Sequence, residues 1–399
     1  MCIRDRFYTA ITQYLGFPHY GDEYKVMGLA PYGNPKYVKE LGDLIDLTDD
    51  GLFKLNLSYF TATNSGVISY GNDNLPTIER LYSSKVEEKF GKARQKGEEL
   101  SQFHMDLAAS VQKFTEYLIF HVLNHLQKRT GLKNVCIAGG VAQNSVANGK
   151  ITRETTFDNV YVPSAGHDAG ISIGAAFYVH NHILKQPRMN PLWSAYTGSR
   201  YTMIQIEDYL KSRNIDYTKH SDEELYEIVS NKLIDAGVVG WFSGPAEFGP
   251  RALGARSILA DPRRTDAKDI LNKKIKRRES FRPFAPSILK EYVKEYFEVD
   301  DVVPFMEKVF PIKKDKYDII PAVTHVDGTG RLQSVDKDIS PRYYNLIESF
   351  RKKTGVPILL NTSFNENEPI VNSPEHALNC YLRTKMDMLV LENCVVQRL

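Results

Sequence analysis

Two consecutive strand–loop–helix units constrain the fold of this chain more than any other feature. A short apolar run at 134–138 leads into the pair Gly139-Gly140 and then into a helical pattern. A second apolar run at 159–162 leads into another glycine-bounded loop and another helix. In α/β sheets, ligands bind at the carboxyl ends of the strands, where such loops lie. The pattern therefore predicts an α/β domain with a binding site in these loops.

Length and composition are typical of a globular protein with two domains. The chain has 399 residues, and single hydrophobic cores stop growing near about 250–300 residues. A net charge of +2 provides no overall basic field, so we expect no nucleic-acid partner and no acidic membrane surface as partner. No apolar run approaches the ~20 residues of a membrane span, and the first residues lack the apolar core of a secretory signal. The four cysteines form no CxxC pair, which favours a reducing compartment, and we expect the cytoplasm.

Before the expected domain junction, one apolar stripe predicts a long helix that ends at Gly131. The stripe consists of Leu107, Val111, Phe114, Leu118, Val122 and Leu126. His121 and His125 stand four apart on this helix, a spacing at which two histidines can share a metal. No acidic residue lies between them, and the apolar stripe marks the helix as a core element. We therefore interpret both histidines as structural.

The segment 185–201 has two prolines and no periodicity, so we predict a domain junction there. The expected domains are 1–184 and 202–399, with 185–201 as the linker. The second domain mixes short strands with loops rich in charge and proline, which favours an α+β fold.

The two glycine loops form the first candidate site. Gly139 and Gly140 allow a backbone to approach a ligand closely, and the helix that begins near Asn144 offers unpaired N–H groups to phosphate. Asp168 lies in the second loop, ahead of a helix of small residues. A glycine pair can simply make a tight turn, and an Asp can simply cap a helix. Together the loops predict a nucleotide and metal site.

Cationic loops form the second candidate site. Arg251 and Arg256 flank Gly254 in a segment whose glycines and prolines indicate a shaped loop. Arginine forks suit bidentate binding of phosphate or carboxylate. A basic run at 272–282 then enters the rigid sequence Phe-Arg-Pro-Phe-Ala-Pro, which fits a cationic wall around one anion better than a nucleic-acid groove.

Two polar turns, 325–331 and 359–365, are singly more typical of structure than of function. Taken together with the other segments, however, they resemble the NodU/CmcH-type carbamoyltransferase family. The resemblance covers nearly the whole chain from about residue 10. It rests on EYKVMGLAPYG at 23–33, GGVAQN at 139–144, AGHDAG at 165–170, EFGPRALGARSILADPR at 247–263, IKRRESFRPFAP at 275–286, HVDGTGR at 325–331 and LLNTSFNENEPIV at 359–371.

The resemblance implies the second half of an actin-like domain (ASKHA, ribonuclease H-like) followed by a YrdC-like α/β domain. It also implies that the YrdC-like part makes carbamoyl adenylate from ATP and carbamoyl phosphate. The actin-like part, with a nucleotide and a divalent metal of the Fe or Mg class, would then transfer the carbamoyl group to a hydroxyl of a small metabolite. The acceptor and the oligomeric state have no recognisable code in the sequence.

Carried over position by position, the resemblance assigns catalytic, cofactor-binding and metal-binding residues. The catalytic residues are Lys276, Arg282 and Arg251, and Asp168 resembles a metal ligand. The expected cofactor-binding residues are Arg331, Asn361 and Ser363, with Arg256, Gly139, Gly140 and Asn144 from the loops above. Forming the adenylate brings two anionic reactants together, so its catalysis is mostly positioning and charge neutralisation.

Two features depart from the family pattern. Pro245 and Ala246 stand where the family usually has an arginine, so one phosphate contact is expected to be missing. The first half of the actin-like domain, with its metal-binding histidine motif, should precede residue 10 and is absent from this sequence. We therefore expect a truncated chain in which Asp168 lacks its metal partners and transfer is incomplete.

Two alternatives remain open at this point. One is a YrdC-type threonylcarbamoyl-adenylate synthase for tRNA modification, although the near-neutral charge supplies no basic RNA path. The other is a non-catalytic remnant that binds a nucleotide or a partner. Pyrophosphate release with different carbamoyl donors distinguishes the three.

Overall fold

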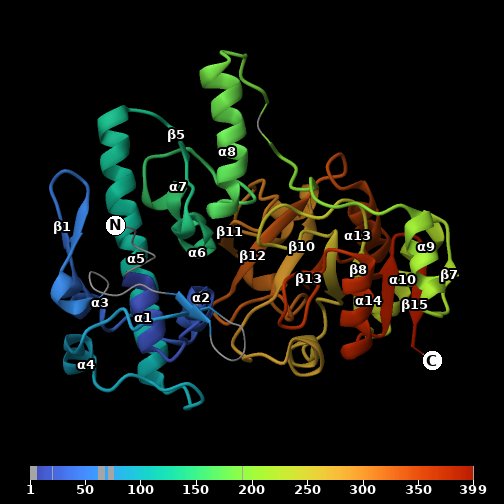
Figure 1. Cartoon of the computed structure of the whole chain (residues 1–399), viewed down its shortest axis with the longest axis horizontal. Coiled ribbons are helices and arrows are strands. Elements are labelled where there is room, and N and C mark those ends of the chain that lie inside the picture. Colours follow the sequence, from blue (N-terminus) through green and yellow to red (C-terminus); the bar gives the residue numbers. More distant parts are fainter. Residues whose placement is uncertain (1–6, 20, 62–67, 71–75, 191, 399) are drawn as a thin grey trace. The chain divides into compact units, whose positions relative to one another are not determined.

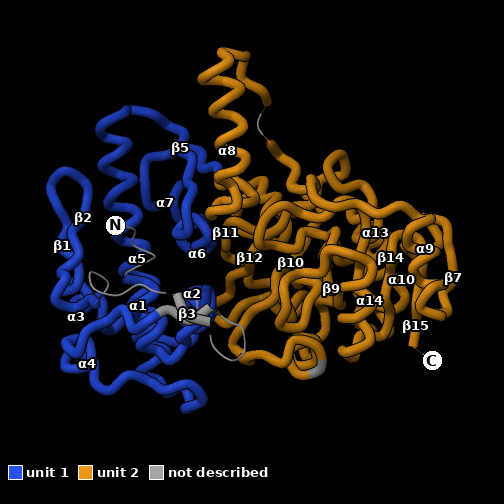
Figure 2. The backbone as a smooth tube through the Cα atoms, in the orientation of Figure 1, with its two compact units in different colours: residues 1–161 blue, residues 162–399 orange. Residues whose placement is uncertain are grey.

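The computed structural model describes residues 7–398, apart from 20, 62–67, 71–75 and 191. The chain divides into two compact units, Met1–Tyr161 and Val162–Leu399 (Figure 2). The predicted linker at 185–201 lies inside the second unit, and the predicted domain boundary stays a prediction. Within the described residues, no helix combines the length and the apolar character that crossing a membrane requires.

The first unit is organised around one long helix, α5 (Gln102–Thr130), which is teal in Figure 1. A capping box between Ser101 and His104 fixes its start, and Gly131, with a φ of +67°, ends it. The buried residues of the predicted stripe are Leu107, Val111, Phe114 and Leu118. Leu126 is 40% exposed, so the buried stripe does not reach the end of the helix.

Short elements surround α5. The helices are α1 (Thr9–Tyr14), α2 (Glu23–Leu29), α3 (Val38–Leu41), α4 (Ser84–Phe90), α6 (Ser145–Asn148) and α7 (Ile151–Glu154). Two antiparallel pairs are β1 (Ile45–Leu47) with β2 (Phe53–Leu55) and β3 (Ile68–Tyr70) with β4 (Pro76–Ile78). The predicted strand–loop–helix units contribute β5 (Asn134–Cys136) and β6 (Asn159–Tyr161), which pair in parallel. The α/β prediction is therefore confirmed for this region.

The second unit contains a nine-stranded mixed sheet in the order β11-β12-β10-β13-β9-β8-β14-β15-β7 (Figure 1). Its strands are β7 (Thr218–Lys219), β8 (Val239–Phe242), β9 (Arg256–Ala260), β10 (Ala285–Leu289), β11 (Lys308–Pro311), β12 (Thr329–Val335), β13 (Ile358–Ser363), β14 (Met388–Leu391) and β15 (Cys394–Gln397). The pairs β10–β12 and β8–β14 are parallel, and the other neighbours are antiparallel. The central strands are buried throughout, as their apolar sequences require.

Helices complete the core of the second unit. They are α8 (Ile171–Phe177), α9 (Met203–Ser212), α10 (Asp222–Ile234), α11 (Ala267–Ile270), α12 (Val293–Tyr296), α13 (Pro341–Thr354) and α14 (Pro374–Arg383). The helices α10 and α13 pack against each other, and α13 also contacts β10 and β13. The structure thus confirms a mixed α/β fold with a large sheet. The finer assignment, an actin-like part followed by a YrdC-like part, stays a prediction.

Candidate functional site

A row of polar side chains crosses one face of the large sheet. Ser287 pairs with Gln333 between β10 and β12 and with Leu359 between β10 and β13, so Asn361, two residues further along, shares their face. The Ser287 hydroxyl donates to Gln333 Oε1 at 2.5 Å. Asn361 Nδ2 lies 3.0 Å from Ser287 Oγ and 3.2 Å from Gln333 Oε1. Because these groups are buried, their mutual hydrogen bonds are what makes a polar row tolerable in the core.

The loop that carries Arg251 is attached to this polar row. Asn361 Nδ2 donates to the carbonyl of Ala252 at 3.2 Å, and Gln333 Nε2 donates to the carbonyl of Leu253 at 2.7 Å. Gly254 has a φ of +110°, and a Cβ there would lie 2.1 Å from the ring of Tyr343. Only glycine fits that position, which explains the Leu-Gly-Ala sequence.

The carboxylate of Glu247 holds the same loop through hydrogen bonds to its backbone. Glu247 Oε1 accepts backbone N–H groups from Leu253 at 2.6 Å, Ala255 at 2.7 Å and Arg256 at 3.3 Å. These bonds replace the regular hydrogen bonding that the loop lacks. The prediction of a shaped loop from 247 to 256 is therefore confirmed.

The charges of three arginines act on a fourth, Arg331, and we call these residues the cation group: Arg251, Arg278, Arg282 and Arg331. Burial lowers the pKa of Arg331 well below its usual range, and the charges of the other three lower it further. Burial also lowers the pKa of Arg251 to about 10. Among the described residues, Arg331 Nε is buried without a hydrogen-bond partner. Like charges held together with an unused donor form a site that favours an anion.

Lys276 lies beside the cation group but uses its ammonium group internally. It is 1% exposed, and Nζ lies 2.5 Å from the Ser363 carbonyl and 3.2 Å from Ser363 Oγ. Nζ also lies 2.8 Å from the Asn365 carbonyl and 2.7 Å from Asn365 Oδ1. Burial, followed by the charges of Arg278 and Arg282, lowers the pKa of Lys276 well below its usual value. An ammonium has three donors, so in this arrangement Lys276 holds the 363–365 turn in place.

Arg256 does not join the cation group, although the sequence placed it among the phosphate-binding residues. Its guanidinium donates to the carbonyls of Gly244, Ala255 and Ser199 at 2.9–3.0 Å. It also stacks on the ring of Phe242, 3.5 Å from the centroid. With only 1% of the residue exposed, we assign Arg256 a structural role.

The two ends of the GGVAQN loop differ: Gly139 has a positive φ, whereas the side chain of Asn144 is hydrogen-bonded. Gly139 has a φ of +99° ahead of η5 (Gly140–Gln143). Asn144 caps α6 by accepting from Ala147 N at 3.0 Å, and it exchanges two hydrogen bonds with Gln112 at 3.0 and 3.1 Å. The Asn144 side chain is therefore committed to the fold, which leaves only the glycine backbone for a ligand.

Asp168 is exposed and begins the short helix η6 (Asp168–Gly170). Among the described residues, no group of three or more His, Cys, Asp and Glu side chains is arranged to hold a metal ion. The described part of the chain therefore does not fit a complete metal site around Asp168.

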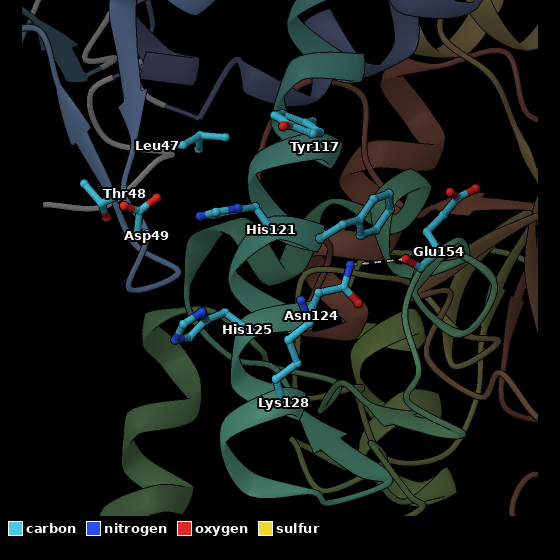
Figure 3. Close-up of a pocket in the computed structure, with 10 residues that line it drawn as sticks. Leu47, Thr48, Asp49, Tyr117, His121, Asn124, His125, Lys128 and Glu154 are labelled. Carbon is cyan, nitrogen blue, oxygen red and sulfur yellow. Dashed lines mark hydrogen bonds between the residues drawn. The ribbon is translucent and has the colours of Figure 1, made fainter.

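A cavity of about 550 Å³ lies in the first unit, and none of the predicted site residues lines it (Figure 3). It is lined by Leu47, Thr48, Asp49, Tyr117, Phe120, His121, Asn124, His125, Lys128 and Glu154. Both histidines of α5 thus border a cavity rather than the core that their sequence context indicated. The one lysine is balanced by two carboxylates, so this cavity lacks the positive charge that phosphates require.

Comparison with known proteins places the chain in a family. The carbamoyltransferase N-terminus model matches residues 5–177, and the carbamoyltransferase C-terminus model matches residues 230–398. Nodulation protein NolO of Bradyrhizobium diazoefficiens is 39% identical over 98% of this chain and 68% of its own length. The chain belongs to the carbamoyltransferase family. The resemblance seen in the sequence motifs is therefore confirmed at the level of the family.

Other curated relatives are longer than the matched region. An uncharacterised protein of Synechocystis is 44% identical over 98% of this chain and 66% of its own length. Nodulation protein NolNO of Sinorhizobium fredii is 40% identical over 98% of this chain and 55% of its own length. The chain thus spans between about half and two thirds of the length of these relatives.

Sequence reasoning missed several residues of this candidate site. Arg278 was part of the recognised basic run but was not distinguished from Arg277, which is exposed. Gln333 and Ser287 stand in apolar strands, and a polar residue at a buried strand position is the signal that points to them. Asn365 becomes important only because the chain turns back onto Lys276.

Proposed function

We propose that the second unit makes carbamoyl adenylate from ATP and carbamoyl phosphate. The observation that carries this proposal is the cation group, in which three like charges act on Arg331 while its Nε is an unused donor among the described residues. Both reactants are polyanions, and bound phosphates would cancel the repulsion between the arginines. Because Arg278 and Arg282 are held by hydrogen bonds to Asn272 and Glu279, these two charges need little reorganisation when charge moves between phosphates.

One amide supports a carbamoyl donor over other acyl phosphates. Asn361 Nδ2 donates to the carbonyl of Ala252 and to Ser287 Oγ. Asn361 Oδ1, in contrast, is buried without a partner among the described residues. A free acceptor suits the NH₂ of a carbamoyl group, which an acetyl group lacks. A site built to accept that hydrogen bond rejects the analogue, because the acceptor is then left unpaired.

Transfer of the carbamoyl group to a hydroxyl of a small metabolite is the activity we propose for the complete protein. The developing oxyanion needs a stabilising charge, which a divalent metal supplies as Lewis acid when bound. Asp168 alone does not constitute that site. The proposal for the described residues therefore concerns the adenylate-forming step.

The direct test follows pyrophosphate release from ATP with different donors. We expect release that requires carbamoyl phosphate and does not occur with acetyl phosphate. Release that requires threonine and bicarbonate would instead identify a threonylcarbamoyl-adenylate synthase. No release with any donor, together with retained ATP binding, would identify a non-catalytic nucleotide-binding protein.

A further inference from the structure

His325, in the loop before β12, has one ring nitrogen without a partner. Nε2 is buried and makes no hydrogen bond among the described residues. Nδ1 lies 3.1 Å from the hydroxyl oxygen of Thr329. A buried unpaired ring nitrogen is unusual enough to need a function or a bound molecule.

The neighbours of His325 determine which nitrogen carries the proton. The Thr329 hydroxyl donates its single proton to Asp327 Oδ1 at 2.7 Å, and Asp327 also accepts from Thr329 N at 3.1 Å. Thr329 Oγ1 can therefore only accept from His325, so Nδ1 carries the hydrogen. Nε2 then keeps its lone pair, buried and without a partner among the described residues. This order, carboxylate to hydroxyl to imidazole, holds the ring in the tautomer that a base requires.

His325 also lies close to one member of the cation group, because Thr329 and Arg331 are two residues apart on β12 and therefore share a face of the strand. The groups that act on it are Asp327, Arg331, Lys268 and the carbonyl of Phe284. Burial lowers the pKa of His325 to about 4, Asp327 opposes this shift, and Arg331 and Lys268 add to it, so the ring is neutral near pH 7. Arg331 Nε is an unused donor and His325 Nε2 an unused acceptor among the described residues, and a bound water is the usual partner of such buried groups.

We propose that His325 is the general base that activates the water consumed when carbamoyl adenylate is made. The proposal rests on the proposed function, whose stoichiometry requires one water: carbamoyl phosphate, ATP and water give carbamoyl adenylate, phosphate and pyrophosphate. The water oxygen bonds to phosphorus as its proton moves to Nε2, and carbamate leaves with the electron pair of the broken P–O bond. A carbamate oxygen then attacks the α-phosphorus of ATP, and pyrophosphate leaves.

The test uses two donors, because ammonium carbamate supplies carbamate without the water step. In His325→Asn, the amide NH₂ keeps the contact with Thr329 while the Nε2 lone pair is lost. We expect pyrophosphate release with carbamoyl phosphate to fall by about 10²–10⁴-fold. Release with ammonium carbamate should stay within a few-fold of wild type. Equal loss with both donors, or no loss with carbamoyl phosphate, would overturn the assignment.

Two further variants keep the test decisive. His220 also contacts a threonine hydroxyl, with Nε2 2.8 Å from Thr218 Oγ1, but it follows β7 at the opposite edge of the sheet. His220→Asn should leave both donors unaffected. If His325→Asn does not fold, Thr329→Val frees the ring tautomer and should still slow only the carbamoyl phosphate reaction, and an unchanged rate would contradict the proposal. A wild-type protein that is silent with both donors would refute the proposed function itself.

Discussion

Buried polar groups in the first unit form a network that pairs opposite charges. Tyr8 and Asn144 donate to Gln112 Oε1 at 3.2 and 3.0 Å. Gln112 Nε2 in turn donates to Glu116 at 3.0 Å, and Lys150 pairs with the same carboxylate at 2.6 Å. Within this network only Glu116 Oε2 is left without a partner. Apart from that one oxygen, the polar groups of this network find their partners within the first unit.

The cation group of the second unit has the opposite character. Its members all carry a positive charge, and Arg251, Arg278 and Arg282 each lower the pKa of Arg331. Arg282 pairs with Glu279 and Arg278 donates to Asn272, but the charges of the group still repel one another, which stability alone does not explain. The difference teaches that pairing, more than burial, separates structural polar groups from ligand-binding ones.

The largest effect is expected for Arg331→Met. Removing one charged donor from the site should reduce carbamoyl phosphate-dependent pyrophosphate release by about 10²–10³-fold. The melting temperature should not fall, because Arg331 Nε has no hydrogen-bond partner among the described residues and the neighbouring arginines repel its charge. Turnover assays and thermal unfolding check both statements. A large loss of stability would show that Arg331 belongs with the structural groups.

Arg256→Met is expected to show the reverse pattern. Three backbone carbonyls lose their donor, which should destabilise the protein by about 3 kcal/mol. Pyrophosphate release per folded molecule should remain close to that of wild type, as denaturant titration combined with the same assay would show. An unchanged stability with lost activity would return Arg256 to the phosphate site.

A smaller effect is expected for Asn144→Ala in the first unit. Loss of the cap of α6 and of the bonds to Gln112 should cost about 1–2 kcal/mol of stability. Adenylate formation in the second unit should not change. Parallel measurements of unfolding and pyrophosphate release would test this, and a selective loss of activity would indicate that Asn144 contacts a ligand.

The smallest effect concerns the pH dependence of stability. The pKa of His325 is lowered to about 4 in the folded protein, so the unfolded chain binds more protons at mildly acidic pH. The contribution of the neutral ring is present above the ordinary pKa of about 6.5 and is lost as the pH falls towards 4. We expect His325→Asn to show a shallower loss of stability in this window. Identical pH profiles would mean that burial in the folded protein does not lower the pKa of His325.

The sequence predicted the elements whose signals are local. The apolar stripe and Gly131 located α5, and the glycine loops located the parallel pair β5–β6. Glycines and prolines predicted the shaped loop, because Gly254 must adopt a backbone that other residues avoid. These features depend on residues that are close in the sequence, so sequence patterns are sufficient to predict them.

The roles of individual cations depended on distant contacts. Arg251 and Arg256 are five residues apart in one motif, yet Arg256 stacks on Phe242 and binds carbonyls whereas Arg251 joins the cation group. Lys276 meets Ser363 and Asn365 across almost ninety residues of chain. No local signal distinguishes such cases, since the partners are brought together only by the order of strands in the sheet.

Calorimetric titration of carbamoyl phosphate into the wild-type, Arg331→Met and Arg256→Met proteins tests the central claim most directly. If the cation group holds the anionic donor, the wild-type and Arg256→Met proteins will bind it, and Arg331→Met will bind at least about tenfold more weakly. Equal affinity in all three proteins would contradict the account.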